Sequence, residues 1–145
     1  MASRAKGLRL PEDLERDLER ESRLRGGPSF SELAVSLLRE AVRMRRVPGI
    51  FFVDGLDGRR AAIWATGLEV WEVIRNYKVT GEDHERLKEF YPWLTGSQLT
   101  AALTYYELYP DEIDARIERD ERWTPEKVYR DFPFMRPKSP DDSRS

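Results

Sequence analysis

Residues 6–10 form a short stretch of alternating character that is followed directly by a proline. In an extended chain Leu8 and Leu10 share one face, and Gly7 and Arg9 share the other. A strand this short must cover its leucines and pair its backbone edge with another strand. Because the nearest later strand candidate lies beyond two predicted helices, the expected partner is the same stretch of a second copy of the chain.

Two helices are predicted after this strand. The first runs from Pro11 to about Arg25, because a proline and several acidic residues favour a helix start. Residues 26–28, Gly-Gly-Pro, end it. Residues 29–32, Ser-Phe-Ser-Glu, match a capping box, and apolar residues at helical spacing continue to about Arg46. The predicted order is strand, helix, turn, helix.

This order resembles the ribbon-helix-helix DNA-binding module of the Arc, MetJ and CopG type over residues 4–46. The matching residues are Gly-Leu-Arg-Leu-Pro at 7–11, Leu14, Leu18, Gly27 and Ser-Phe-Ser-Glu-Leu at 29–33. In that family two strands pair into an antiparallel β-ribbon that enters the major groove. The resemblance implies a homodimer, or a higher oligomer, that binds operator DNA.

The resemblance also assigns roles to ribbon residues. Ala5, Gly7 and Arg9 would face outward and read bases, and Arg9 is the only long polar side chain among them. A bidentate arginine to guanine contributes roughly 1 to 3 kcal/mol of discrimination. Lys6 falls on the inward side, where the family usually has an apolar residue. It is therefore expected at a frayed strand start or in contact with a phosphate.

The family anchors DNA phosphates at the N-terminus of its second helix. Carried over to this chain, Ser29, Phe30 and Ser31 would present backbone amides there. An alternative interpretation of the same residues is an interchangeable basic arm on an amphipathic helical hairpin.

Charge is distributed unevenly along the 145 residues. Residues 1–46 carry 11 Lys/Arg and 8 Asp/Glu, a net charge of +3, whereas residues 47–145 carry 14 and 19, a net charge of -5. A basic front fits nucleic-acid binding. The absence of cysteine excludes disulfides and thiol nucleophiles. No apolar run could span a membrane or form a signal peptide, so we expect a cytoplasmic protein without membrane contact.

A second module is predicted over residues 50–122, after a linker at 47–49. Residues 50–53 and 59–64 predict a small β-hairpin around the loop 54–58. The Asp-Gly pairs of this loop could suggest calcium binding, but the ligand spacing of an EF-hand is missing. Turn chemistry is the favoured explanation.

Four short helices are predicted to follow the hairpin. Capping boxes at residues 66–69 and 95–98 start two of them, a further helix spans about 82–90, and Pro110 separates the third from the fourth. The predicted fold class is mainly α, with a ribbon-helix-helix unit, a β-hairpin and a helix-turn-helix-like helical domain.

The second module is similar to a small helical domain known from VapB-like antitoxins, over roughly residues 48–119. The pattern consists of Thr-Gly-Leu-Glu-Val-Trp at 66–71, Tyr-Pro-Trp-Leu-Thr at 91–95, Gln-Leu at 98–99 and Ala-Leu-Thr-Tyr-Tyr at 102–106. The resemblance implies a helix-turn-helix-like core and a PIN-like ribonuclease toxin as partner. A family-typical Gly-Thr-Arg at the hairpin is not evident.

Neither DNA reading nor catalysis is favoured for this module. The third helix is expected to expose uncharged side chains, Ala101 among them, whereas phosphate contacts dominate DNA affinity. Residues 82–85, Glu-Asp-His-Glu, could suggest a metal ligand or a general base. Adjacent helical residues point in different directions, so an acidic helix start is favoured. We expect no catalytic residues, no metal and no cofactor.

Residues 123–145 are predicted to form an extended or disordered tail. Thr-Pro-Glu at 124–126 could start one short helix, but prolines over 131–140 prevent its continuation. The aromatic residues either fold back on the helical module or wrap around a partner. An arginine inserted into a nuclease site rich in carboxylates would neutralise it. The candidate toxin-binding residues are Arg130, Phe132, Phe134, Met135, Arg136 and Lys138.

Together these features predict an antitoxin of a type II toxin-antitoxin pair that represses its own operon and neutralises a PIN-like ribonuclease. The alternative is a stand-alone ribbon-helix-helix transcriptional regulator with a C-terminal oligomerisation or ligand-sensing domain. An enzyme has little support.

Overall fold

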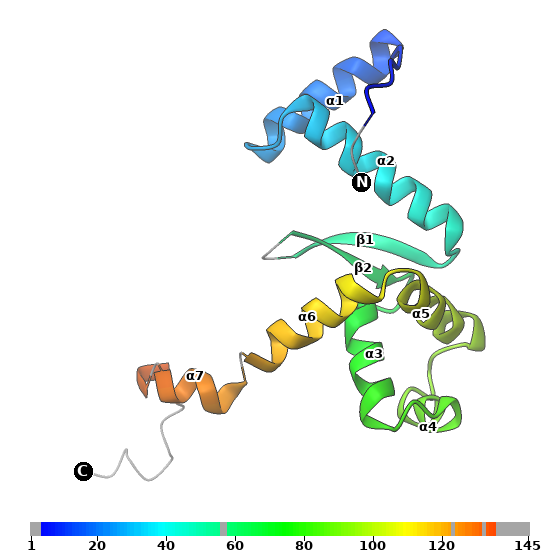
Figure 1. The fold of residues 1–145 in the computed structure, drawn as a ribbon, viewed down its shortest axis with the longest axis vertical. Helices are drawn as coiled ribbons and strands as arrows, with labels where there is room; N and C mark the ends of the chain where they lie inside the picture. Colours follow the sequence, from blue (N-terminus) through cyan, green and yellow to red (C-terminus); the bar gives the residue numbers. More distant parts are fainter. Residues whose placement is uncertain (1–3, 56–57, 123, 132, 136–145) are drawn as a thin grey trace. The chain divides into compact units, whose positions relative to one another are not determined.

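The computed structural model describes residues 4–55, 58–122, 124–131 and 133–135. The chain divides into two compact units, Met1–Arg46 and Val47–Ser145. In the described residues it forms seven α-helices, one short 3-10 helix and a two-stranded antiparallel sheet (Figure 1). The prediction of a mainly α protein with a small hairpin is confirmed. None of the helices in the described ranges is long and apolar enough to cross a membrane.

The first unit is a helical hairpin of α1 (Glu12–Arg25) and α2 (Phe30–Arg46). The chain leaves α1 through Gly26, whose φ of 64° lies in the left-handed region that favours glycine. The Ser22 hydroxyl donates a hydrogen bond of 2.8 Å to the carbonyl of Pro28. This bond ties the end of α1 to the residues that precede α2.

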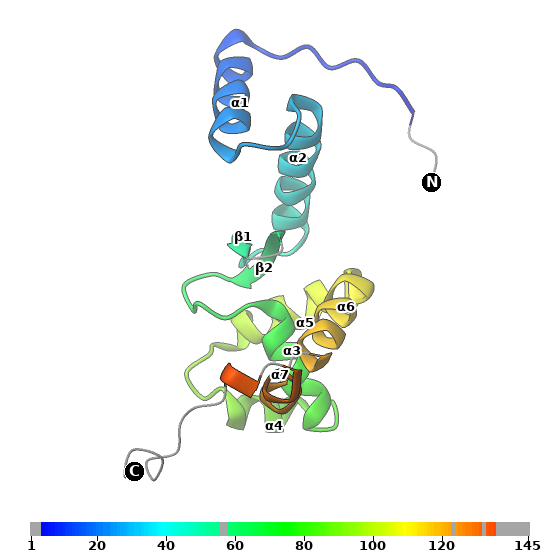
Figure 2. The same ribbon diagram turned by 90° about the vertical axis from the view of Figure 1, so that its left-hand side faces the viewer.

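Residues 4–11 form neither helix nor strand, and Figure 2 shows them running away from the start of α1. Leu8 is 70% exposed. A strand requires a second strand to pair with, so an isolated chain leaves this stretch unpaired. The intermolecular ribbon stays a prediction.

The second unit begins with the predicted β-hairpin. Strands β1 (Ile50–Gly55) and β2 (Gly58–Ile63) pair antiparallel, with Ile50 opposite Ile63 and Gly55 opposite Gly58. Arg59 donates to the Asp54 carboxylate at 3.1 Å across the hairpin end. The inner end of the hairpin is buried, whereas Asp54, Gly58 and Arg59 toward its outer end are exposed.

Four helices complete the module. They are α3 (Val70–Val79), α4 (His84–Phe90), α5 (Gly96–Leu108) and α6 (Pro110–Arg122). The capping box at Thr95 and Gln98 forms as predicted.

The prediction of a capping box at residues 66–69 is wrong. Glu69 caps α3 instead, in a reciprocal pair with Glu72. The Thr66 hydroxyl donates to the carbonyl of Ile63 at 2.9 Å and accepts from the amide of Leu68 at 3.0 Å. Thr66 therefore shapes the turn after β2, and the helix starts one turn later.

One hydrophobic core holds this module together. Helix α3 contacts α4, α5 and α6, and the hairpin packs on α3 and α5. The largest fully buried side chains are those of Tyr105, Ile63, Ile74, Leu87, Leu99, Val47, Val70 and Val73. Close packing of these residues, together with Ile113 and Ile117 of α6, fixes the helices and the hairpin relative to one another.

Charged pairs join α3 to α6 beside this core. Arg75 contacts Asp120 at 2.8 Å, and Lys78 contacts Asp114 at 2.6 Å. The hydrogen bond from Lys78 lowers the pKa of Asp114, and the same bond raises the pKa of Lys78.

The C-terminal segment is not extended where the structure describes it. Residues Pro125–Asp131 form α7, and Pro133–Met135 form a single 3-10 turn, η1. The hydroxyl of Thr124 accepts from the amide of Lys127 at 3.3 Å, which is a helix-capping contact. The expectation of an extended tail is wrong for Pro133–Met135, whereas the short helix anticipated to start at residues 124–126 is present as α7.

Candidate nucleic-acid interface

The first unit has more apolar surface than it can bury alone. Among its described apolar residues only Leu18 and Leu33 are buried, where α1 meets α2. Val35, Leu38 and Val42 are each more than half exposed. Their spacing of three and four residues places them on one face of α2, which we call the α2 stripe. The stripe is a surface that a second protein chain would cover.

The size of the unit gives the same indication. A unit of 46 residues rarely buries enough surface to fold without oligomerisation, a metal or disulfides, and the chain has no cysteine. Covering half of each stripe side chain gains roughly 1 kcal/mol per residue. Two copies of the stripe would contribute several kcal/mol, which is comparable to the stability of a small domain.

The predicted base-reading residues lie in the N-terminal arm. Ala5, Lys6, Gly7 and Arg9 are all exposed. A Cβ atom built on Gly7 meets nothing within 4 Å. With Arg4 also exposed, the arm therefore presents two guanidinium groups and one ammonium group, and a closely approaching nucleic-acid backbone meets no bulk at Gly7.

The predicted phosphate anchor lies at the start of α2. Ser29 accepts from the amide of Glu32 at 3.2 Å, and the Glu32 carboxylate accepts from the amide of Ser29 at 3.2 Å. The amides of Phe30 and Ser31 belong to the first helical turn, where N–H groups have no intrahelical acceptor. These two amides are suited to an anion, although the Glu32 carboxylate lies at the same helix end.

The structure describes only part of the predicted toxin-binding set. Arg130 is exposed and lies 3.7 Å from the carboxylate of Asp131. Phe134 is 82% exposed. Met135 ends η1. The remaining three residues, Phe132, Arg136 and Lys138, lie outside the described residues.

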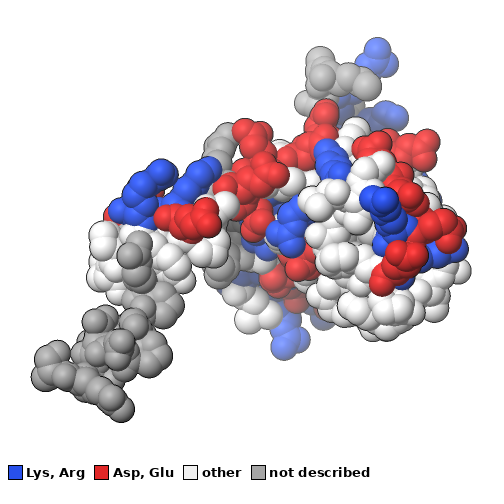
Figure 3. All heavy atoms as spheres, turned by 90° about the horizontal axis from the view of Figure 1, so that it is seen from below, with Lys and Arg blue, Asp and Glu red and all other residues white. Residues whose placement is uncertain are grey.

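Helix α5 offers little to DNA. Ser97 and Thr100 are exposed as expected, but Ala101 is buried, so its predicted exposure is wrong. The helix has no basic residue in its last turn. On the face of the molecule drawn in Figure 3, acidic side chains lie among the basic ones. These features favour protein contact for the second module.

Of the carboxylates around His84, that of Asp83 caps a helix. Asp83 accepts from the amides of Glu85 and Arg86 at the start of α4. Within the described residues, no group of three or more metal-ligating side chains could hold an ion.

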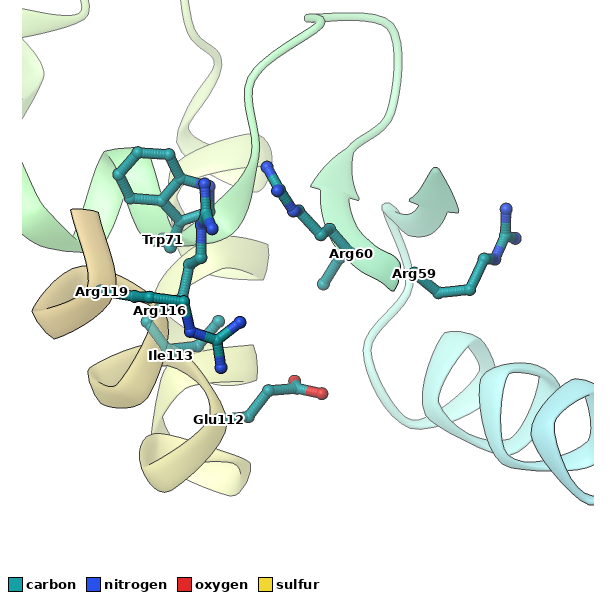
Figure 4. Close-up of a pocket in the computed structure, with 8 residues that line it drawn as sticks. Arg59, Arg60, Trp71, Glu112, Ile113, Arg116 and Arg119 are labelled. Atoms are coloured by element: carbon teal, nitrogen blue, oxygen red, sulfur yellow. The ribbon is translucent and has the colours of Figure 1, made fainter. Parts of the chain in front are cut away.

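The structure gathers one group of residues that no sequence motif singled out. Arg59 and Arg60 of β2 and Arg116 and Arg119 of α6 line a pocket of about 180 Å³ (Figure 4). We call it the arginine pocket. More than fifty residues separate the two pairs, so only the packing of α6 against the hairpin side of α3 brings them together. The sequence feature that could have indicated this pocket is the occurrence of these arginines in a module with a net negative charge.

Comparison of the chain with protein-family models, curated proteins and solved structures found no match.

Proposed function

We propose that this chain is a homodimeric, ribbon-helix-helix type DNA-binding protein that acts as an antitoxin. The observation that carries the proposal is the first unit, in which an unpaired arm with an exposed arginine precedes a helical hairpin with an exposed α2 stripe. Dimerisation through the stripe covers apolar surface, and pairing of two arms satisfies the backbone groups of both.

In such a dimer the two copies of Arg9 lie on the same face of an antiparallel ribbon. Alternate residues of a strand share a face, so Arg9, Gly7 and Ala5 point together toward the major groove. The amides of Phe30 and Ser31 from each subunit hold flanking phosphates and set the register. With one long polar reader per subunit, specificity is modest and benefits from repeated half-sites.

The antitoxin role rests on the second module and the C-terminal segment. The Tyr-Pro-Trp-Leu-Thr pattern at 91–95 and its continuation resemble antitoxin sequences. Exposed Arg130 and Phe134 provide a cation and an aromatic anchor, which are residue types enriched at protein interfaces. A PIN-like ribonuclease with an acidic metal site is the proposed partner.

The dimer is tested by Leu38→Glu, which places a charge in the α2 stripe. Sedimentation should show a dimer for the natural chain and a monomer for this variant, because an unpaired charge cannot be buried cheaply. Arg39→Glu, next to it but off the stripe, is the matched control. A dimer that survives Leu38→Glu would contradict the assignment of the interface.

The DNA-binding role is tested by gel shift on the chain's own promoter. Arg9→Ala should reduce discrimination between operator and scrambled duplex by about tenfold, which corresponds to the loss of one base contact. Arg20→Ala removes the same charge from an exposed position of α1 and should leave discrimination unchanged. Equal discrimination by natural chain and Arg9→Ala removes Arg9 from the reading role.

A further inference from the structure

The turn between α4 and α5 carries two exposed aromatic side chains. Phe90 is 52% exposed and Trp93 is 65% exposed, and we call this pair the aromatic patch. Both rings contact the buried Tyr91, with ring centres 5.0 Å from it for Phe90 and 5.5 Å for Trp93, at interplanar angles of 65° and 82°. Figure 1 shows α4 at the end of the helical module opposite the hairpin. The patch is therefore distinct from the arginine pocket, which is lined by residues of β2, α3 and α6.

Tyr91 holds the patch in one geometry. Its hydroxyl accepts from the side-chain amide of Asn76 at 2.5 Å, which ties it to α3. Its own amide donates to the carbonyl of Leu87 at 3.0 Å, and its carbonyl accepts from the amide of Leu94 at 3.1 Å. Pro92 restricts the backbone between the two exposed rings. Because the rings are positioned beforehand, little conformational entropy is lost when a partner covers them.

Two polar groups beside these rings are available to a partner. Within the part of the chain that the structure describes, the indole N–H of Trp93 has no hydrogen-bond acceptor, and the carboxylate of Glu89 pairs with no cation. Glu89 directly precedes Phe90 at the end of α4. The neighbouring cation, Lys88, contacts Glu85 instead, at 3.8 Å. The patch therefore combines two rings with one free donor and one free negative charge.

The charge of this region indicates which kind of molecule can cover the patch. Residues 82–93 carry four acidic and two basic side chains, a net charge of -2. The phosphates of a nucleic acid would be repelled, because cations dominate the affinity for them. A second copy of the same patch would bring like charges together, which disfavours association. Charge complementarity therefore favours a cationic segment of another protein.

The rings and the indole N–H indicate the conformation of that segment. A polyproline II segment has no internal hydrogen bonds, so its carbonyls can accept from a side-chain donor. Aromatic surfaces bind such segments because prolines pack against the rings at little cost in entropy. We propose that the aromatic patch docks an extended, proline-containing segment of another protein, in which an arginine or lysine pairs with Glu89. This contact is independent of the proposed DNA and toxin contacts, which lie in the N-terminal arm, α2 and the C-terminal segment.

The test is calorimetric titration of the full chain with capped synthetic peptides at low ionic strength. The peptide Pro-Pro-Arg-Pro-Pro should bind. A peptide with glutamine in place of arginine should bind about two- to fivefold more weakly, because it lacks one exposed ion pair. A peptide with glycine in place of every proline should also bind more weakly, because it must be ordered on binding. Absence of binding by the first peptide, or equal binding of either control peptide, overturns the proposal.

Variants of the full chain locate the binding surface. Trp93→Ala removes a ring and the indole N–H and should weaken binding of Pro-Pro-Arg-Pro-Pro about tenfold or more. Trp64→Ala is the matched control, because Trp64 is equally exposed, at 65%, and directly follows β2. It should leave peptide binding unchanged. In Glu89→Gln, a change of an exposed side chain, the arginine and glutamine peptides should bind equally.

Thermal unfolding checks that each variant is folded. Peptide binding that Trp93→Ala leaves unchanged, or that Trp64→Ala weakens as much, would place the peptide elsewhere and overturn the assignment. A preference for the arginine peptide that persists in Glu89→Gln would also contradict it. A sedimentation coefficient that changes in Trp93→Ala without peptide would identify a second copy as the occupant, against the proposal.

Discussion

Glu32 combines two opposing effects in a single side chain. Its carboxylate accepts from the amide of Ser29 and so completes the capping box of α2. The same negative charge lies at the helix end where a DNA phosphate would bind. Stability of α2 and affinity for an anion therefore compete at this residue.

Replacement of Glu32 by glutamine separates these effects. Glutamine also completes a capping box, so the unit should stay folded, while DNA affinity should rise about two- to fivefold per subunit, equivalent to about 0.3–1 kcal/mol at a helix terminus. Fluorescence anisotropy with operator duplex measures the change. Glu21→Gln on α1 carries the same charge change and is the control. An equal rise in both variants would indicate a general charge effect without a phosphate at α2.

Turn chemistry and tertiary packing explain why the capping or exposure of some residues was predicted correctly from the sequence and that of others was not. The boxes at Ser29 and Thr95 use only local contacts, so their spacing was sufficient. At residues 66–69 both Thr66 and Glu69 could have capped the helix. The Thr66 hydroxyl instead bonds to Ile63 and Leu68 in the turn that follows β2. Ala101 was expected at an exposed position, but α5 contacts α3, α6 and both strands, and Ala101 is buried. A local turn decided the first case, and tertiary packing decided the second.

At the level of elements, α3 and α6 are joined by a row of polar contacts. The pairs Arg75–Asp120 and Lys78–Asp114 flank the core, and the hydroxyl of Tyr106 donates to Asp114 at 2.9 Å. Because α6 carries half of the arginine pocket, the geometry of the pocket depends on this row.

The Lys78–Asp114 pair predicts a defined pH dependence. The folded-state pKa of Asp114 is lowered, so its stabilisation is complete above the unfolded value near 3.9 and is lost as pH falls through the folded pKa. The pKa of Lys78 is raised. Its contribution is complete below about 10.4 and is lost only as pH rises through the folded pKa.

A double-mutant cycle with Lys78→Met and Asp114→Asn measures this pair. Both side chains are more than a third exposed, so the coupling free energy at pH 7 should be only about 0.5 kcal/mol. It should fall toward zero in acid, measured by urea unfolding at several pH values. The looser pair Arg86–Asp83, 4.0 Å apart and more exposed, serves as control with no measurable coupling. A coupling that persists unchanged in acid would contradict the ionic origin.

Long-range placement was the part of the fold that the sequence did not reveal. Hydrophobic periodicity and local turn signals located the hairpin and the helices to within a few residues. The arginine pocket has no local signal, because Arg60 and Arg119 line the same pocket only when β2 and α6 both pack on α3. The predicted ribbon would form between two chains, so a single chain does not test its pairing.

At the level of the whole molecule, we propose that the first unit binds DNA and that the C-terminal segment binds the toxin. Deletion of residues 124–145 should abolish toxin inhibition and leave operator binding intact. Co-expression with the product of the neighbouring reading frame, scored by growth and by ribonuclease activity, measures the first effect, and gel shift measures the second. Asp131→Asn, a single change in the same segment that retains Arg130 and Phe134, is the control.

Undiminished inhibition by the shortened chain would remove the C-terminal segment from toxin binding. A neighbouring gene that encodes no small nuclease would favour the stand-alone regulator.

The exposed α2 stripe also links the lifetime of the protein to its concentration. When folding of the first unit depends on a second copy, dilution shifts chains toward the unfolded state by mass action, and unfolded chains are substrates for cellular proteases. If the proposed dimer forms, newly made chains at low concentration are therefore degraded faster than assembled ones. The cellular level of the protein would then fall steeply once synthesis stops.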